Sequence, residues 1–128
     1  MESNSSAGFD RNDYRKENES ILYVGIDLGT SRTSISASNG VRETVASIVG
    51  YPRDVVSKKL LQRDVLFGDE AVANRLALDV YRPLEHGVIK HSDQAGAPSE
   101  EVEGNLEAAR ALIQHAVSLA RPKPGQLV

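Results

Sequence analysis

The chain has 128 residues, a formal net charge of −3 and no cysteine. This length allows one domain, and the lack of cysteine excludes disulfides and thiol catalysis and fits a reducing cytoplasm. Because Lys and Arg form no basic cluster, and because no apolar run suits a signal peptide or a membrane span, we expect no nucleic-acid partner and no membrane insertion.

Residues 1–20 contain few large apolar side chains and many Asn, Ser, Asp, Glu, Arg and Lys residues. Such a segment buries too little apolar surface to offset the entropy that it loses on ordering. We therefore expect a disordered tail over residues 1–20 and a folded domain over residues 21–128.

Three β-strands are predicted at residues 21–27, 33–38 and 41–48. The first has apolar residues on both faces, which is typical of a central strand that is covered on both sides. The second alternates apolar and polar residues, as a half-buried strand does. Asn39-Gly40 favours a two-residue hairpin turn between the second and third strands. Together these features predict a three-stranded antiparallel meander.

The rest of the chain predicts a less regular segment and two helices. Residues 53–67 are ambiguous, with a loop and a short strand at 65–67 as the interpretation. Asp69 is expected at the N-cap of a helix that Arg82-Pro83 ends. After a polar loop at 90–98, a long helix is predicted. The apolar residues of this helix recur at helical spacing: Val102, Leu106, Ala109, Ile113, Ala116 and Ala120, with Leu112 and Val117 beside them. Residues 126–128 have the pattern of a further strand.

The turn after the first strand carries the residues best suited to chemistry. Gly29 permits a tight bend and a close approach to a ligand, and successive amides of residues 29–32 can form an anion-binding concavity. Thr30, Ser31 and Thr33 add hydroxyl groups. Asp27 is an oxygen ligand suited to Mg²⁺, bound through water. The pattern favours a metal–phosphate complex, with a plain hairpin of polar turn residues as the alternative.

Residues 25–31, with the sequence Gly-Ile-Asp-Leu-Gly-Thr-Ser, resemble the first phosphate motif of the actin-like ATPase superfamily. Two further blocks, residues 49–55 with 67–71 and residues 82–89, resemble the bacterial actins that form magnetosome filaments. The similarity runs from about residue 22 to the end of the chain. It implies an α/β fold, namely the N-terminal subdomain of a ribonuclease-H-like, actin-type ATPase.

The resemblance also implies a function and a set of ligand contacts. Members of the family bind ATP with Mg²⁺ in a cleft between two similar halves. Asp27 would hold Mg²⁺ through water, and the backbone amides of residues 29–32 (Gly29, Thr30, Ser31 and Arg32) would hold the phosphates. The implied protein is a cytoplasmic cytoskeletal filament that organises magnetosomes, with further copies of itself and magnetosome-associated proteins as partners.

Several parts of the family's active site have no counterpart in residues 49–128: the second phosphate hairpin, the adenosine pocket and the acid that positions water. The catalytic residues are therefore expected downstream. We expect the complete protein to hydrolyse ATP and this segment alone to be inactive. One alternative is the N-terminus of a chaperone or of a sugar kinase, although sugar kinases usually carry Trp soon after this motif and this chain has none. Another is a truncated, non-catalytic relative that binds filaments.

The remaining polar residues favour simpler roles. A zinc site at His86 and His91, with Asp93 nearby, lacks both cysteine and close ligand spacing. His115 is expected as a partly buried helix residue. Lys58 and Lys59 are expected at the surface, with a filament contact as the alternative.

Overall fold

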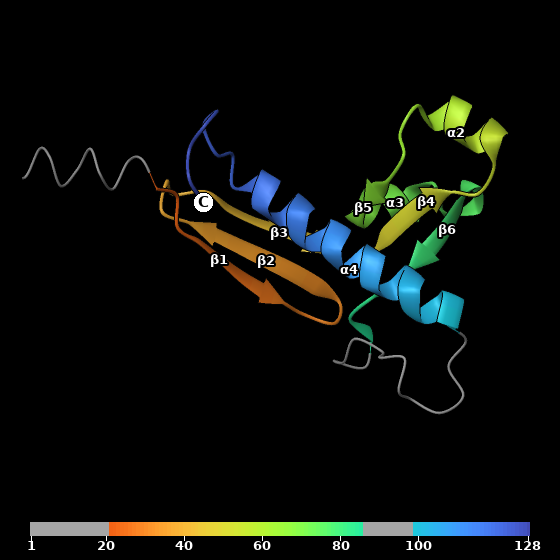
Figure 1. The fold of residues 1–128 in the computed structure, drawn as a ribbon, viewed down its shortest axis with the longest axis horizontal. Helices are drawn as coiled ribbons and strands as arrows, with labels where there is room; N and C mark the ends of the chain where they lie inside the picture. The colour runs from red at the N-terminus through yellow and green to blue at the C-terminus, as the bar shows by residue number, and fades with distance from the viewer. Residues whose placement is uncertain (1–20, 86–98) are drawn as a thin grey trace, which may run out of the picture.

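The structure of the chain, a computed structural model, describes residues 21–85 and 99–128 (Figure 1). Two small β-sheets lie next to each other, and one long helix runs across both of them (Figure 1). The predicted tail at 1–20 and the possible zinc site at His86 and His91 lie outside the described residues. The elements are β1 (Val24–Leu28), β2 (Arg32–Ala37), β3 (Arg42–Ala46), β4 (Val49–Pro52), α2 (Val55–Leu61), β5 (Leu66–Phe67), α3 (Gly68–Ala73), a 3₁₀ turn (Arg75–Ala77), β6 (Leu78–Tyr81) and α4 (Ser99–Leu119).

The first sheet has the order β1-β2-β3 with antiparallel neighbours, which confirms the predicted meander. The connection between β2 and β3 differs from the predicted two-residue turn. The Ala37 amide donates to the Val41 carbonyl at 2.9 Å, so the three residues 38–40 form the loop. Gly40 has a φ of +90°, and a three-residue loop that ends in a residue with positive φ is a common hairpin connection.

Within the described residues, β1 lies at the edge of this sheet and not at its centre as predicted. Helix α4 packs on the face that carries Val24 and Ile26, whereas Tyr23 is 60% exposed. The further strand predicted at residues 126–128 is represented by one parallel bridge, between Leu127 and Ile21. The apolar pattern on both faces of the first strand therefore does not correspond to two covered faces here.

The second sheet has β4 at its centre, with β5 and β6 antiparallel on either side. The short strand predicted near Phe67 is confirmed as β5. The long helix predicted from Asp69 to Arg82 is wrong beyond Ala73, because residues 78–81 form β6. Leu78 is buried and lies opposite Pro52 of β4, so strand pairing outweighs the helical spacing of the apolar residues.

The boundaries of the two short helices also differ from the prediction. Asp69 lies in the first turn of α3 and not at its N-cap, which is Phe67. Helix α2 occupies residues 55–61 of the segment 53–67 that was ambiguous in the sequence. The Asp54 side chain caps it by accepting a 2.7 Å hydrogen bond from the Ser57 amide. None of its residues is buried, and Val55, Val56 and Leu60 are exposed apolar residues, so the apolar pattern of this segment does not reflect packing in the core.

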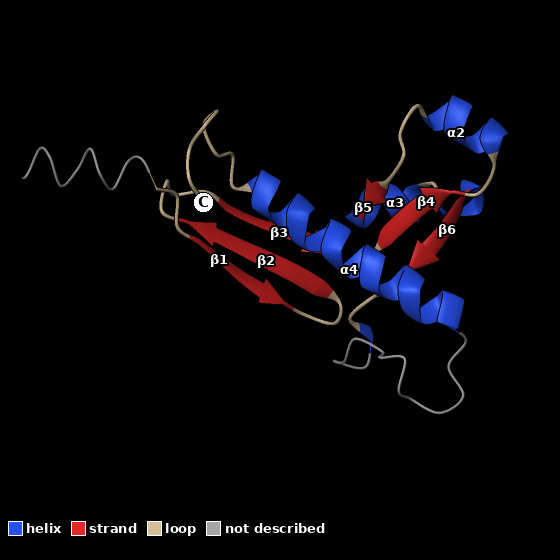
Figure 2. Cartoon of the chain, viewed as in Figure 1, coloured by secondary structure: helices blue, strands red, loops and turns tan. Residues whose placement is uncertain are grey.

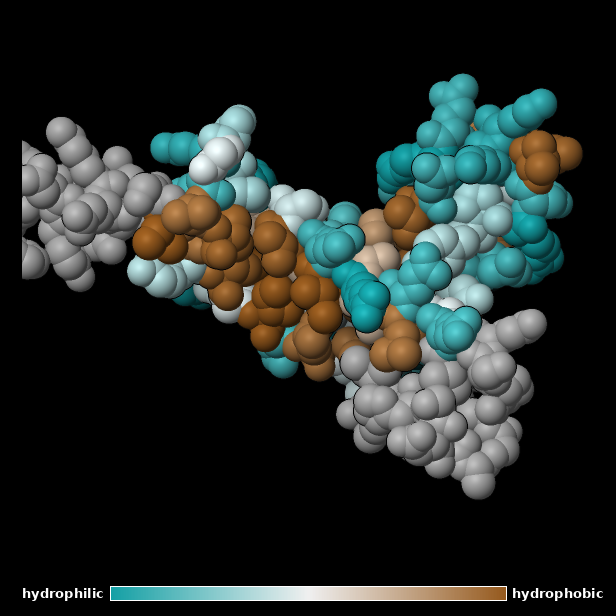
Figure 3. Space-filling view, viewed as in Figure 1, coloured by the Kyte–Doolittle hydropathy of each residue, from teal (hydrophilic) through white to brown (hydrophobic). Residues whose placement is uncertain are grey.

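Helix α4 confirms the predicted long helix and joins the two sheets. Ala116 near its C-terminal end, and Ala120 just after that end, pack against the first sheet. Ala108 and Leu112 pack against Val49 of the second sheet. Ile113, which was assigned to the buried stripe, is 37% exposed. Hydrophobic surface remains visible over the C-terminal half of α4 and the adjacent part of the first sheet (Figure 3).

No helix in the described ranges is both long enough and apolar enough to span a membrane.

His115 is partly buried, as predicted, and gives the fold a pH-sensitive contact. Its imidazole stacks on the ring of Phe67, with the ring centroids 4.0 Å apart and the planes 6° from parallel. Burial lowers the pKa of His115 below 6.5, and the nearby Arg63 lowers it further, while Glu70 opposes the shift. The folded chain therefore favours the neutral imidazole.

We expect the free energy of unfolding to fall as the pH drops below about 6.5, because there the unfolded chain binds a proton at His115 that the folded chain binds more weakly. Above that pH, both states hold the neutral ring and this contribution is constant. Urea denaturation between pH 5 and pH 8 measures the dependence. His115→Phe retains an aromatic ring over Phe67 and should show a smaller dependence; equal curves for the two proteins would contradict the assignment.

Candidate functional site

The predicted phosphate turn, residues 29–31, connects β1 to β2 at one end of the first sheet (Figure 2). Gly29 donates its amide to the Asp27 carbonyl at 3.2 Å, so the chain begins to reverse immediately after the strand. The two strands then pair in register, with Leu28 opposite Thr33. The position of this turn was thus predicted correctly from the sequence. The turn is a short connection between two paired strands.

The turn is held from behind by Ser47, at the bend between β3 and β4. The Ser47 hydroxyl donates to the Gly29 carbonyl at 2.7 Å, and the Ser47 amide donates to the Ser31 carbonyl at 2.9 Å. Ser47 is only 1% exposed. Two carbonyl oxygens of the turn are therefore directed toward the protein interior.

The opposite groups of the turn remain available. Within residues 21–85 and 99–128, the backbone amides of Thr30 and Ser31 make no hydrogen bond, and both residues are exposed. Adjacent amides that have no partner within the protein can form a site for an anion. The anion-binding concavity expected from the sequence stays a prediction, which these two free amides support.

Gly29 is required by the geometry of the turn itself. A Cβ atom at this position would lie 2.2 Å from the Arg32 carbonyl oxygen, which is backbone and cannot rotate away. The glycine therefore permits the turn to close on itself, and any side chain would force it open.

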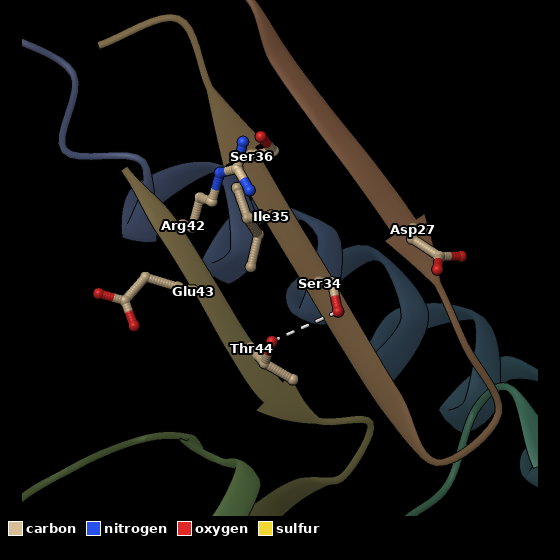
Figure 4. A pocket seen from close by; sticks show the side chains of 7 residues that line it. All are labelled: Asp27, Ser34, Ile35, Ser36, Arg42, Glu43 and Thr44. Atoms are coloured by element: carbon tan, nitrogen blue, oxygen red, sulfur yellow. Dashed lines mark hydrogen bonds between the residues drawn. The ribbon is translucent and has the colours of Figure 1, made fainter. Parts of the chain in front are cut away.

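Asp27 lies at the end of β1 on the sheet face opposite α4. It borders a shallow hollow of about 390 Å³ (Figure 4). Cross-strand pairing places Ser34 opposite Asp27 and Thr44 opposite Ser34, and their two hydroxyl groups lie 3.4 Å apart. The other residues that line the hollow are Ile35, Ser36, Arg42 and Glu43.

The Asp27 carboxylate is exposed and makes no hydrogen bond or ion pair with the described part of the chain. In the same part of the chain, no group of three or more His, Asp or Glu residues is placed to hold a metal ion. A single free carboxylate beside an anion site is suited to hold Mg²⁺ through water, with the remaining ligands supplied by phosphate oxygens and solvent. The residues present therefore fit a Mg–phosphate complex.

Thr33 and Arg32 are placed differently from each other. Thr33 is fully buried, and its hydroxyl lies 2.9 Å from the Ser47 hydroxyl, so it faces the interior and not the ligand side of the turn. Arg32 is exposed at the start of β2, and its guanidinium has no ion-pair partner within the described residues. Of the expected hydroxyl donors, Thr30 and Ser31 remain on the open side.

Sequence reasoning did not single out Ser47. The signal that could have found it is its position inside the apolar run Val-Ala-Ser-Ile-Val at residues 45–49. A hydroxyl group buried in such a run requires a hydrogen-bond partner. That partner is the turn, which lies 16 to 18 positions earlier in the chain.

No protein-family model matches the chain. Three curated proteins resemble it. The actin-like protein MamK of Paramagnetospirillum magneticum is 43% identical over 103 residues, and that of Magnetospirillum gryphiswaldense is 43% identical over 101 residues. A MamK-like protein of Paramagnetospirillum magneticum is 37% identical over 112 residues. These matches cover 79% to 88% of this chain.

The chain is a homologue of the MamK actin-like proteins. Solved MamK structures share its fold: a non-polymerising mutant bound to AMPPNP superposes with a TM-score of 0.68 at 40% identity over 82% of this chain. A MamK double helical filament gives a TM-score of 0.66 at 39% identity over 80% of this chain. The expected α/β fold of an actin-like N-terminal subdomain is thus confirmed. The chain spans 26% to 30% of the length of the MamK relatives it matches.

Proposed function

We propose that this chain forms the part of a bacterial actin-like filament protein that binds the phosphates of Mg-ATP. The observation that carries the proposal is the turn at residues 29–31. It presents the free amides of Thr30 and Ser31 beside the free carboxylate of Asp27. One MamK homologue has been solved with AMPPNP, an ATP analogue, and another as a filament, which supports both parts of the proposal.

In this proposal, each residue of the turn has a separate task. The amides of Thr30 and Ser31 and the side chain of Arg32 neutralise phosphate charge, and Asp27 orients the hydrated Mg²⁺. Thr33 supports the turn from the buried side. The groups that activate water belong to a part of the protein outside residues 21–128, so hydrolysis is a property of the full-length protein.

The proposed setting is the one that the sequence resemblance implies, and the filaments formed by MamK homologues support its filament part. The full-length protein assembles with further copies of itself into a cytoskeletal filament in the cytoplasm and positions magnetosomes through magnetosome-associated proteins. Nucleotide binding at the turn would then control assembly. Such control requires that the nucleotide site and the surfaces that contact further copies be energetically coupled.

The proposal predicts that the full-length protein pellets on ultracentrifugation in the presence of Mg-ATP and that Asp27→Ala abolishes this dependence. The substitution removes the carboxylate that would hold Mg²⁺ beside the phosphates. Asp69→Ala, which removes another exposed carboxylate in the first turn of α3, is the matched control and should pellet normally. If pelleting of the Asp27→Ala variant still increases when ATP is added, the proposal is contradicted.

A further inference from the structure

The Ser47 hydroxyl is the centre of a buried hydrogen-bond chain that ends on the turn. It lies 2.9 Å from the Thr33 hydroxyl and 2.7 Å from the Gly29 carbonyl oxygen. Ser47 and Thr33 are 1% and 0% exposed, so water does not replace either partner. The same residue also donates its backbone amide to the Ser31 carbonyl at 2.9 Å.

The direction of each hydrogen bond in this chain is fixed by the number of protons. A carbonyl oxygen only accepts, so Ser47 must donate its single hydroxyl proton to Gly29. The bond between the two hydroxyls is then donated by Thr33 to Ser47. Thr33 therefore orients the Ser47 hydroxyl, and the Ser47 hydroxyl in turn orients the Gly29 carbonyl.

We propose that Ser47 is a positioning residue for nucleotide binding, which acts by holding the phosphate turn from behind. This inference rests on the proposed function. A peptide group is planar, so fixing the Gly29 carbonyl inward fixes the Thr30 amide on the opposite side of the same plane. By the same rule, fixing the Ser31 carbonyl orients the Arg32 amide. Ser47 touches no ligand in this scheme; it sets the direction of the amides that do.

The position of Ser47 also links the turn to the rest of the fold. It lies at the bend where the chain leaves β3 in the first sheet and enters β4 in the second. The next residue, Ile48, accepts a hydrogen bond from Gly68 at the start of α3.

Two variants separate positioning from simple stability. Ser47→Ala removes both hydroxyl hydrogen bonds, whereas Thr33→Val removes only the one that Thr33 donates and leaves the Ser47 hydroxyl on Gly29. Both variants lose a buried hydrogen bond, so both should lower the thermal midpoint of unfolding. Only Ser47→Ala frees the turn carbonyl.

The experiment measures the dissociation constant of Mg-AMPPNP by calorimetry for the full-length protein and for both variants. We expect Ser47→Ala to raise this constant about tenfold, which corresponds to the loss of one hydrogen bond. The increase caused by Thr33→Val should be several-fold smaller than the increase caused by Ser47→Ala. The backbone amide resonance of Thr30 gives a second readout, because it should broaden in free Ser47→Ala and remain sharp in Thr33→Val. If Ser47→Ala does not fold, Ser47→Cys keeps a side chain there with a weak donor and allows the same comparison.

Equal dissociation constants for Ser47→Ala and the unmodified protein, with a lowered midpoint of unfolding, would show a structural role only and overturn the inference while the proposed function stands. Equal losses of affinity in Ser47→Ala and Thr33→Val would overturn it too, since affinity would then follow stability. If the unmodified protein does not bind Mg-AMPPNP, the proposed function and this inference fail together.

Discussion

Gly29→Ala is expected to abolish nucleotide binding by the full-length protein. The added Cβ would lie 2.2 Å from the Arg32 carbonyl oxygen, far inside van der Waals contact. Relief of this clash requires the turn to open, which displaces the Thr30 and Ser31 amides from their present direction. Because displacements of about 1 Å at a positioned site cost about a hundredfold, we expect the dissociation constant of Mg-AMPPNP to rise at least that much in calorimetry.

Gly40→Ala provides the control, because Gly40 closes the hairpin at the other end of β2. Its φ of +90° makes a side chain unfavourable, although no atom lies within 4 Å of the added Cβ. This variant should lose stability through backbone strain and retain nucleotide affinity. If Gly29→Ala binds Mg-AMPPNP as tightly as Gly40→Ala does, the turn is not the phosphate site.

The second large effect is expected at Leu112, in the middle of α4. Its side chain is fully buried among Val49, Leu84 and Ala108, where the helix meets the second sheet. Leu112→Ala removes this packing and leaves a cavity, which costs about 2–5 kcal/mol in well-packed cores. Chemical denaturation should show the loss as a lower midpoint with a similar dependence on denaturant.

The same substitution at an exposed leucine gives the comparison. Leu76 follows α3 and is 86% exposed, so Leu76→Ala should change the free energy of unfolding by about 0.5 kcal/mol or less. Similar midpoints for Leu76→Ala and Leu112→Ala would contradict the placement of α4 across the two sheets.

The sequence predicts the elements whose pattern reflects their own packing. Strand β2 alternates because one of its faces lies against α4, and α4 shows a helical repeat because one stripe is buried along its length. In both, local spacing and burial agree. The meander and the long helix could therefore be predicted without knowledge of tertiary contacts.

The elements that could not be predicted depend on contacts distant in sequence or on no burial at all. Residues 78–81 have apolar spacing that suits a helix, yet pairing with β4 makes them a strand. Helix α2 buries none of its residues, so its apolar residues do not report core packing, and the Asp54 cap marks its start. Burial patterns carry no information about either of these segments.

The candidate site divides in the same way. Asp27, Gly29, Thr30 and Ser31 are contiguous, and residue types suited to a phosphate turn identify them directly. Ser47 belongs to the site through two hydrogen bonds to residues far from it in sequence. Thr33 is contiguous with the motif, but its place on the buried face of β2 turns its hydroxyl inward.

The most direct measurement is a structure of the full-length protein with Mg-AMPPNP. The account predicts phosphate oxygens about 3 Å from the amides of Thr30 and Ser31, with Mg²⁺ joined to the Asp27 carboxylate through water. Phosphates bound elsewhere, with these two amides still facing solvent, would contradict it.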